Sequence, residues 1–200
     1  MTFSGLHRIS FLLLLLPAGC TTGQVKEAGY AMPAPATLRA CYGYSCRYSA
    51  AFPVTPAVAD RFAAIMAAGA GSPDAERAAV SAAVQYYEEL SAGAIGARDQ
   101  PRSPVVASGE KGQMDCIDES TNTRGLLLYL DQRRLLRHHA LRPNTSRGLL
   151  LDGRYPHWTA VLRDSSGKDW AVDSWFEAAG GPPDIVPLSY WRTRGVLGER

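Results

Sequence analysis

The chain has 200 residues, a formal net charge of +2 and 46% hydrophobic residues. Its basic residues are scattered rather than clustered, so the charge pattern does not indicate a protein that binds nucleic acid. The length suits one globular domain with a sizeable core, and no internal repeat is visible.

The first twenty residues have the organisation of a signal peptide: a weakly basic start, an apolar run over residues 9–16, and small residues after it. The apolar run is too short to span a bilayer. Ala18-Gly19-Cys20 resembles the end of the lipobox of bacterial lipoproteins, in which the cysteine becomes the lipidated first residue. We therefore expect an exported, periplasmic protein that is anchored to a bacterial membrane through lipid on Cys20. The alternative is ordinary cleavage nearby, which leaves a soluble exported protein.

Residues 21–40 are expected to form a flexible tether, because the stretch from Gln24 to Leu38 is rich in Pro and Ala. Residues 41–200 are then expected to form a single domain. With Cys20 lipidated, Cys41 and Cys46 can close a small disulfide loop outside the cytosol. Their spacing is not that of a redox-active Cys-x-x-Cys pair. Cys116 remains as a free thiol, which an oxidising compartment tolerates when the thiol is buried or used.

Two packing helices without chemically active residues are predicted next. Thr55-Pro56 has the pattern of an N-cap followed by proline at the first helical position, and Gly69 to Gly71 ends this helix. Ser72-Pro73-Asp74 repeats the start signal for a second helix, which stops near Gly93. The apolar stripe of the second helix is formed by Val80, Val84 and Tyr87.

After a long polar loop over residues 96–112, a third helix is predicted from Asp115 or Cys116 to about Arg134. Its expected apolar face carries Ile117, Thr121, Leu128 and Leu135. The histidines 138 and 139 are expected to end this helix, where cations complement its dipole, rather than to bind a metal. Residues 135–147 are predicted to turn the chain, and residues 148–151 to form a short strand.

A β-hairpin is predicted from His157 to Trp175, with its turn at residues 164–167. If Asp164 pairs with Lys168, Asp173 is the diagonal neighbour of His157 on the same face of the sheet. A slip of one residue would place the two side chains on opposite faces. Beyond the hairpin, residues 184–188 are expected to add an edge strand, and Trp191 to pack on the core.

Cys116, His157 and Asp173 are the candidate catalytic residues. Free N–H groups at a helix start favour a thiolate at Cys116, and His157 would take its proton and later return it. Asp173 would hold the second imidazole nitrogen. The backbone N–H of Cys116 and the side chain of Gln113 are candidate donors to an oxyanion. The carboxylates of Asp115 and Asp118 oppose a thiolate electrostatically, and helix capping is the role expected of them.

The segment Asp115-Cys116-Ile117-Asp118, with His157 41 residues after Cys116 and Asp173 16 residues later, resembles the bacterial transglutaminase-like cysteine proteinases. These belong to the wider transglutaminase/papain-like superfamily. The resemblance implies an α+β fold in which the helix bearing Cys116 packs on an antiparallel sheet that carries His157 and Asp173. Met114 stands where the family has Gly. Residues 113–121 are also similar to a group of uncharacterised proteobacterial envelope proteins.

Two functions from different classes follow. The first is an exported thiol enzyme, a peptidase or transamidase, that acts on an amide bond of an envelope protein or peptide through an acyl-enzyme. The alternative is a non-catalytic envelope lipoprotein that uses the same fold as a binding or adaptor module, with Cys116 as a small buried hydrophobe. No cofactor is expected. No metal site is expected either, because Asp115, Asp118 and Glu119 have no histidine at ligand spacing.

Overall fold

The computed structural model describes Met1 and residues 37–102, 104–149, 151 and 156–194. The predicted signal peptide beyond Met1, Cys20 and residues 21–36 of the expected tether lie outside the described residues. The described part has the mixed α+β architecture that the sequence predicts, with four α-helices and a four-stranded antiparallel sheet. None of its helices is both long enough and apolar enough to cross a membrane.

A β-hairpin opens the described domain. β1 (Thr37–Tyr42) pairs antiparallel with β2 (Tyr48–Pro53), so the folded part begins within the segment that was expected to be a tether. Leu38 and Ala40 are buried and alternate with exposed residues, which is the period-two pattern of a half-buried strand. The alternating pattern is short and directly follows a stretch rich in Pro and Ala, so the sequence predicted a tether up to residue 40 instead of a strand.

The two predicted packing helices are confirmed as α1 (Pro56–Ala67) and α2 (Pro73–Ile95). Each starts with proline after a hydroxyl N-cap, Thr55 or Ser72, whose side chain accepts a backbone N–H three residues on. The predicted stripe on α2 is buried, and the Tyr87 hydroxyl donates a 2.5 Å hydrogen bond to a β1 carbonyl. α2 thereby holds the hairpin in place.

Gly69 lies where α1 turns towards α2, and a Cβ there would meet Ala79 Cβ at 2.6 Å and Glu76 Cα at 2.8 Å. We expect Gly69→Ala to lower the free energy of unfolding by about 1–3 kcal/mol, because helix backbone rather than a flexible side chain must move. Gly71→Ala is the matched control, since a Cβ at Gly71 meets nothing within 4 Å. It should stay within about 0.5 kcal/mol of the wild type in urea unfolding. Equal midpoints for the two variants would contradict this packing.

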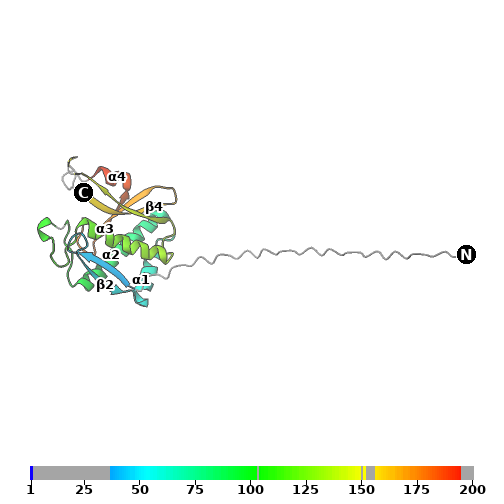
Figure 1. The fold of residues 1–200 in the computed structure, drawn as a ribbon, viewed down its shortest axis with the longest axis horizontal. Coiled ribbons are helices and arrows are strands. Elements are labelled where there is room, and N and C mark those ends of the chain that lie inside the picture. The colour runs from blue at the N-terminus through cyan, green and yellow to red at the C-terminus, as the bar shows by residue number, and fades with distance from the viewer. Residues whose placement is uncertain (2–36, 103, 150, 152–155, 195–200) are drawn as a thin grey trace. The chain divides into compact units, whose positions relative to one another are not determined.

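α3 (Cys116–Gln132) lies between the β1–β2 hairpin and the four-stranded sheet (Figure 1). The predicted start is confirmed, and the helix ends two residues before the expected end. The face that was expected to be apolar is wrong: Ile117 and Leu128 are 38% and 42% exposed. Leu126, Leu127 and Leu130 are buried instead, because α3 is covered on two sides and not along one stripe.

The four-stranded sheet has the order β3-β4-β5-β6, with β3 (His139–Arg147), β4 (His157–Asp164), β5 (Asp169–Asp173) and β6 (Asp184–Pro187). The hairpin register is confirmed, since Ala160 pairs with Val172 as the expected turn requires. β6 is the predicted edge strand. The short helix α4 (Leu188–Thr193) follows it and carries Trp191, which is fully buried as expected.

Residues 139–147 form a strand and not the predicted turn. Pro143 and Asn144 do not break the strand, because they lie at an irregularity in the β3–β4 pairing between Arg142 and Thr145. The strand that was predicted over residues 148–151 is therefore wrong for Gly148, Leu149 and Leu151, which lie outside regular strands; residue 150 is outside the described part.

His138 and His139 do not end α3, since His139 is the first residue of β3 and is buried. The Glu76 carboxylate on α2 accepts the backbone N–H groups of Arg137, His138 and His139 at 2.6, 3.0 and 2.9 Å. It also contacts His139 Nδ1 at 2.9 Å. A single buried side chain thus holds the corner between α3 and β3.

Candidate active site

His157 and Asp173 form a buried pair on adjacent strands. His157 Nε2 lies 2.8 Å from Asp173 Oδ2, and the two side chains are 2% and 1% exposed. The Trp191 indole N–H donates to the same oxygen at 2.7 Å, and the backbone N–H of Trp175 donates to Oδ1 at 3.4 Å. The carboxylate therefore has three donors that fix its position.

The hydrogen bond to Asp173 decides which nitrogen of a neutral His157 carries the proton. An ionised carboxylate only accepts, so Nε2 is assigned as the donor and Nδ1 as the basic nitrogen. Nδ1 is buried and has no hydrogen-bond partner among the described residues. Nδ1 is therefore able to accept a proton.

Aromatic rings surround the imidazole of His157. The ring centres of Trp175, Phe176 and Trp191 lie 4.8, 5.7 and 5.7 Å from it. The sequence indicates core packing for Trp191 but not its bond to Asp173. A buried indole N–H requires an acceptor, and that requirement is the signal that could have revealed this role.

Cys116 is the first residue of α3, and it is 8% exposed. Its Sγ lies 4.0 Å from the carbonyl oxygen of Pro156, and the backbone N–H of Trp158 points to the same sulfur. The sulfur thus lies against the chain on both sides of His157. The fold brings all three predicted side chains to one region, at the start of α3 and the adjoining ends of β4 and β5.

Burial, together with the charges of Asp115 and Asp173, raises the pKa of the Cys116 thiol to about 11 against the opposing effect of the Trp158 N–H. At neutral pH the resting group is therefore the thiol and not the thiolate. Proton removal by a neighbouring base must accompany any attack by this sulfur.

The two acidic neighbours of Cys116 are bound as caps, as the sequence predicts. Asp115 is the N-cap of α3, and Asp118 completes a capping box with it. Asp118 also accepts the backbone N–H groups of Tyr44 at 2.8 Å and Cys46 at 2.5 Å, and Asp115 accepts that of Ser45 at 3.0 Å. Burial raises the pKa of Asp118 to about 6.

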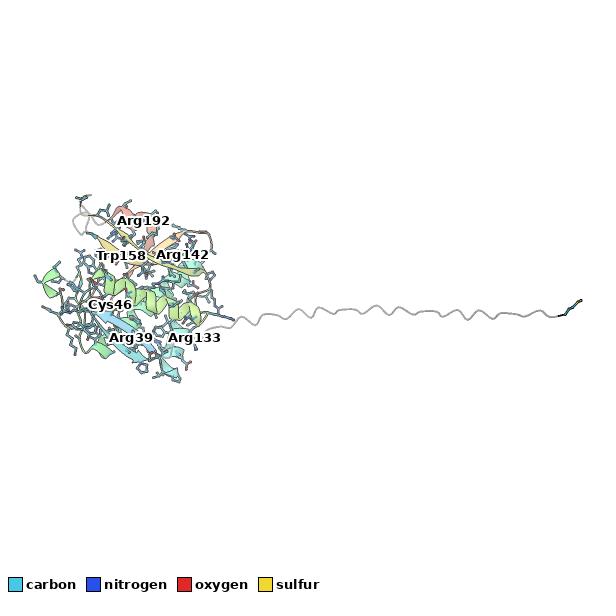
Figure 2. All side chains as sticks on the ribbon, in the orientation of Figure 1. Arg39, Cys46, Arg133, Arg142, Trp158 and Arg192 are labelled. Carbon is cyan, nitrogen blue, oxygen red and sulfur yellow. A yellow bond between two sulfur atoms is a disulfide. The ribbon has the colours of Figure 1, made fainter. Side chains whose placement is uncertain are left out.

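These donors come from the loop that the Cys41–Cys46 disulfide closes, the pair expected from the sequence. Tyr44, Ser45 and Cys46 have φ angles of 70°, 53° and 55°, a left-handed conformation that costs on the order of 1–2 kcal/mol per non-glycine residue. The disulfide and the two carboxylates hold the loop in it. Figure 2 labels Cys46 of this loop and Trp158 of β4 near one end of α3, and Arg133 just past the other end.

A cavity of about 270 Å³ opens beside Cys116. The helix start contributes Asp115, Cys116 and Ile117 to its wall, and the remaining wall consists of Tyr44, Val105, Pro156, Trp158 and Trp175. His157 lies behind this wall, between two residues that form it. Gln113 does not line the cavity, and its amide donates to the Arg98 carbonyl at 3.2 Å. The Cys116 N–H remains the candidate oxyanion donor.

A cluster of buried carboxylates, Glu88, Asp99 and Glu119, lies behind the site, and the sequence does not predict it. Glu119 accepts a 2.7 Å hydrogen bond from Ser174, the residue after Asp173. Asp99 accepts the backbone N–H of Met114 at 2.7 Å, two residues before Cys116. The cluster therefore holds the chain next to Cys116 and next to Asp173.

Burial and mutual repulsion act on these carboxylates together. Burial raises the pKa of Glu88 to about 8, with the charge of Asp99 adding to the effect, and raises that of Glu119 well above its ordinary value. In the described part of the chain no group of three or more His, Cys, Asp or Glu side chains could hold a metal ion. Comparison of the chain with protein-family models, with curated proteins and with solved structures finds no match.

Proposed function

We propose that the protein is an exported thiol enzyme that acts on amide or peptide bonds through Cys116, His157 and Asp173. The geometry of His157 carries the proposal. Its Nε2 donates to the Asp173 carboxylate, while its buried Nδ1 has no partner among the described residues. The residue before it, Pro156, contacts the Cys116 sulfur through its carbonyl oxygen. A histidine that served only packing would not need an orienting acid and a vacant basic nitrogen.

In the first half of the reaction, Cys116 Sγ attacks the acyl carbon while His157 Nδ1 takes the thiol proton. The oxygen that becomes negative accepts from the Cys116 N–H at the start of α3. The carbon–nitrogen bond then breaks, and His157 gives its proton to the departing amine. A thioester on Cys116 and a free amine result, while Asp173 balances the imidazolium charge in between.

In the second half, water or an amine attacks the thioester carbon, and His157 takes the proton of the attacking group. Collapse breaks the carbon–sulfur bond and returns the proton to Cys116. Water gives a carboxylic acid, the outcome of a peptidase, and an amine gives a new amide, the outcome of a transamidase. The same residues serve both outcomes.

The arrangement also supports a papain/transglutaminase-like fold, in which a helix-borne cysteine meets a histidine and an acid on an antiparallel sheet. The Cys41–Cys46 disulfide suits an oxidising compartment, which agrees with the proposed export and with a periplasmic location. The substrate is then an envelope protein or peptide, and Cys20 would carry the lipid anchor.

Alkylation of Cys116 by iodoacetamide, followed by mass spectrometry, tests the activated pair. We expect His157→Ala to slow alkylation at neutral pH by about 10²-fold or more, because the thiol loses its base. The rate of this variant should rise with pH towards about 11, the pKa of the thiol. His138→Ala, which removes a histidine that contacts Ala70 O, is the control and should react as the wild type. Equal rates for His157→Ala and the wild type would favour the non-catalytic adaptor.

A further inference from the structure

Tyr44 reaches the cavity from a part of the chain that no reaction step above uses. It is half-buried, it lines the cavity with Cys116, and its hydroxyl donates to the carbonyl of Pro104, the residue before Val105. Its own N–H is bound by Asp118 at 2.8 Å. Tyr44 is therefore held at two points: its backbone by Asp118 of α3, and its hydroxyl by the loop that follows α2.

The surroundings of Tyr44 are apolar and open to solvent. Val105, Ile117 and Trp158 line the same cavity and are 70%, 38% and 40% exposed. A contiguous patch of large, solvent-exposed apolar side chains is typical of a binding surface. Among the described residues that line the cavity, Asp115 is the only one with a charged side chain, and it accepts N–H groups from Ser45 and from the helix start. Its negative charge opposes an anionic ligand.

The size of the cavity limits what it can hold. Pockets for drug-sized ligands measure about 300–1,000 Å³, and this cavity measures about 270 Å³. It therefore accommodates an acyl group with one adjacent side chain rather than a long hydrocarbon chain. The aromatic walls favour a ring or a bulky aliphatic group at that place.

We propose that Tyr44 is a specificity-determining residue, and that the Cys41–Cys46 loop is a recognition element that selects peptide acyl donors with an aromatic or bulky aliphatic side chain next to the reacting carbonyl. The inference rests on the proposed function of Cys116. The disulfide helps the two carboxylates to keep Tyr44, Ser45 and Cys46 in the left-handed region. We expect loss of the disulfide to loosen the loop and to displace Tyr44 from the wall.

Peptidyl fluoromethyl ketones that end in Phe, Ala or Glu test the selection on the full exported chain. Each forms a bond between Sγ and the methylene carbon, releases fluoride and leaves the thiol proton on His157. The rate of Cys116 labelling is followed by mass spectrometry. We expect the Phe reagent to react about tenfold faster than the Ala reagent, and the Glu reagent to be the slowest. The Phe-to-Ala ratio is internally controlled, because both reagents attack the same thiol.

Variants then locate the selection. Tyr44→Ala and the double variant Cys41→Ser/Cys46→Ser should each lower the ratio about fivefold or more, whereas Tyr44→Phe, which keeps the ring, should retain it. Leu128→Ala is the control. Leu128 lies on α3 and is about as exposed as Ile117, but it does not line the cavity, so this variant should leave the Phe-to-Ala ratio unchanged. If the double variant does not fold, the two Tyr44 variants still decide the matter.

Equal rates for the Phe and Ala reagents, or a ratio unchanged in Tyr44→Ala, would overturn the assignment. A long-chain acyl reagent that reacts faster than the Phe reagent would overturn it as well. In each of these cases the proposed function stands as long as iodoacetamide labelling still depends on His157. The loss of that dependence would remove the proposed function first.

Discussion

Replacing Asp173 with Ala should lower the free energy of unfolding by about 3–5 kcal/mol. The change leaves the Trp191 indole N–H and His157 Nε2 buried without their common acceptor. Asp169→Ala is the matched control on the same strand, since Asp169 pairs with Arg163 at the surface and should cost no more than about 1 kcal/mol. Urea unfolding of both variants measures the difference, and similar midpoints would show that the buried pair does not stabilise the fold.

Asp173→Asn separates orientation from stability, because it keeps the shape of the side chain while removing its charge. An amide favours the other histidine tautomer, and a change of this kind in a Ser-His-Asp triad costs about 10⁴ in kcat. We therefore expect a large loss of Cys116 labelling by the peptidyl reagents with a smaller loss of stability. Unchanged labelling of a folded Asp173→Asn protein would exclude Asp173 from the proposed reaction.

The buried carboxylates should make the protein less stable as the pH rises from about 5 to about 8. The folded pKa of Glu88, about 8, exceeds its ordinary value of 4.5, so the unfolded chain releases this proton before the folded chain does. The stability that the protonated form provides is complete only below the unfolded pKa of 4.5, and it is lost progressively as the pH rises towards 8. Each such group contributes up to about 1.4 kcal/mol per pH unit.

Glu88→Gln should flatten this dependence, because the amide stays neutral at every pH in the window. Glu89→Gln changes an exposed neighbour that pairs with Arg98, and it should keep the slope of the wild type. Urea unfolding at several pH values from about 5 to about 8 gives the slopes. A wild-type stability that rises across this window would be incompatible with carboxylates that hold their protons in the folded state.

Local signals predicted the parts of the fold that local interactions form. Thr55-Pro56 and Ser72-Pro73 fix the starts of α1 and α2 through hydrogen bonds within three residues. The turn at residues 164–167 likewise sets the register of the hairpin, and with it the meeting of His157 and Asp173. In each case the contact that determines the structure joins residues that are close together in the sequence.

The elements that the sequence did not reveal depend on partners far along the chain. β1 is a strand because β2 and α2 cover it, and Pro143 is tolerated in β3 because the pairing with β4 is irregular there. The apolar face of α3 was misassigned because its polar first turns are buried against the disulfide loop. Asn122, for example, accepts from the Cys41 N–H at 2.6 Å and donates to the Cys41 carbonyl at 2.9 Å.

The candidate site shows the same division. Motif order and strand parity suffice to nominate Cys116, His157 and Asp173. The bond from Trp191 to Asp173, the hydrogen bonds of the disulfide loop to Asp118 and the bond from Met114 to Asp99 all join segments that lie far apart in the sequence. Gln113, the other candidate oxyanion donor, lies three residues before Cys116, yet its amide donates to the Arg98 carbonyl.

The Glu76 carboxylate bears on how the molecule assembles. The backbone N–H groups that it binds lie 61 to 63 residues later in the chain. During synthesis, the Glu76 carboxylate on α2 therefore has no such partners until residues 137–139 have been made. The helical half and the sheet half therefore share one buried anion that neither can satisfy alone. We therefore expect the two parts to unfold together in a single transition rather than one after the other.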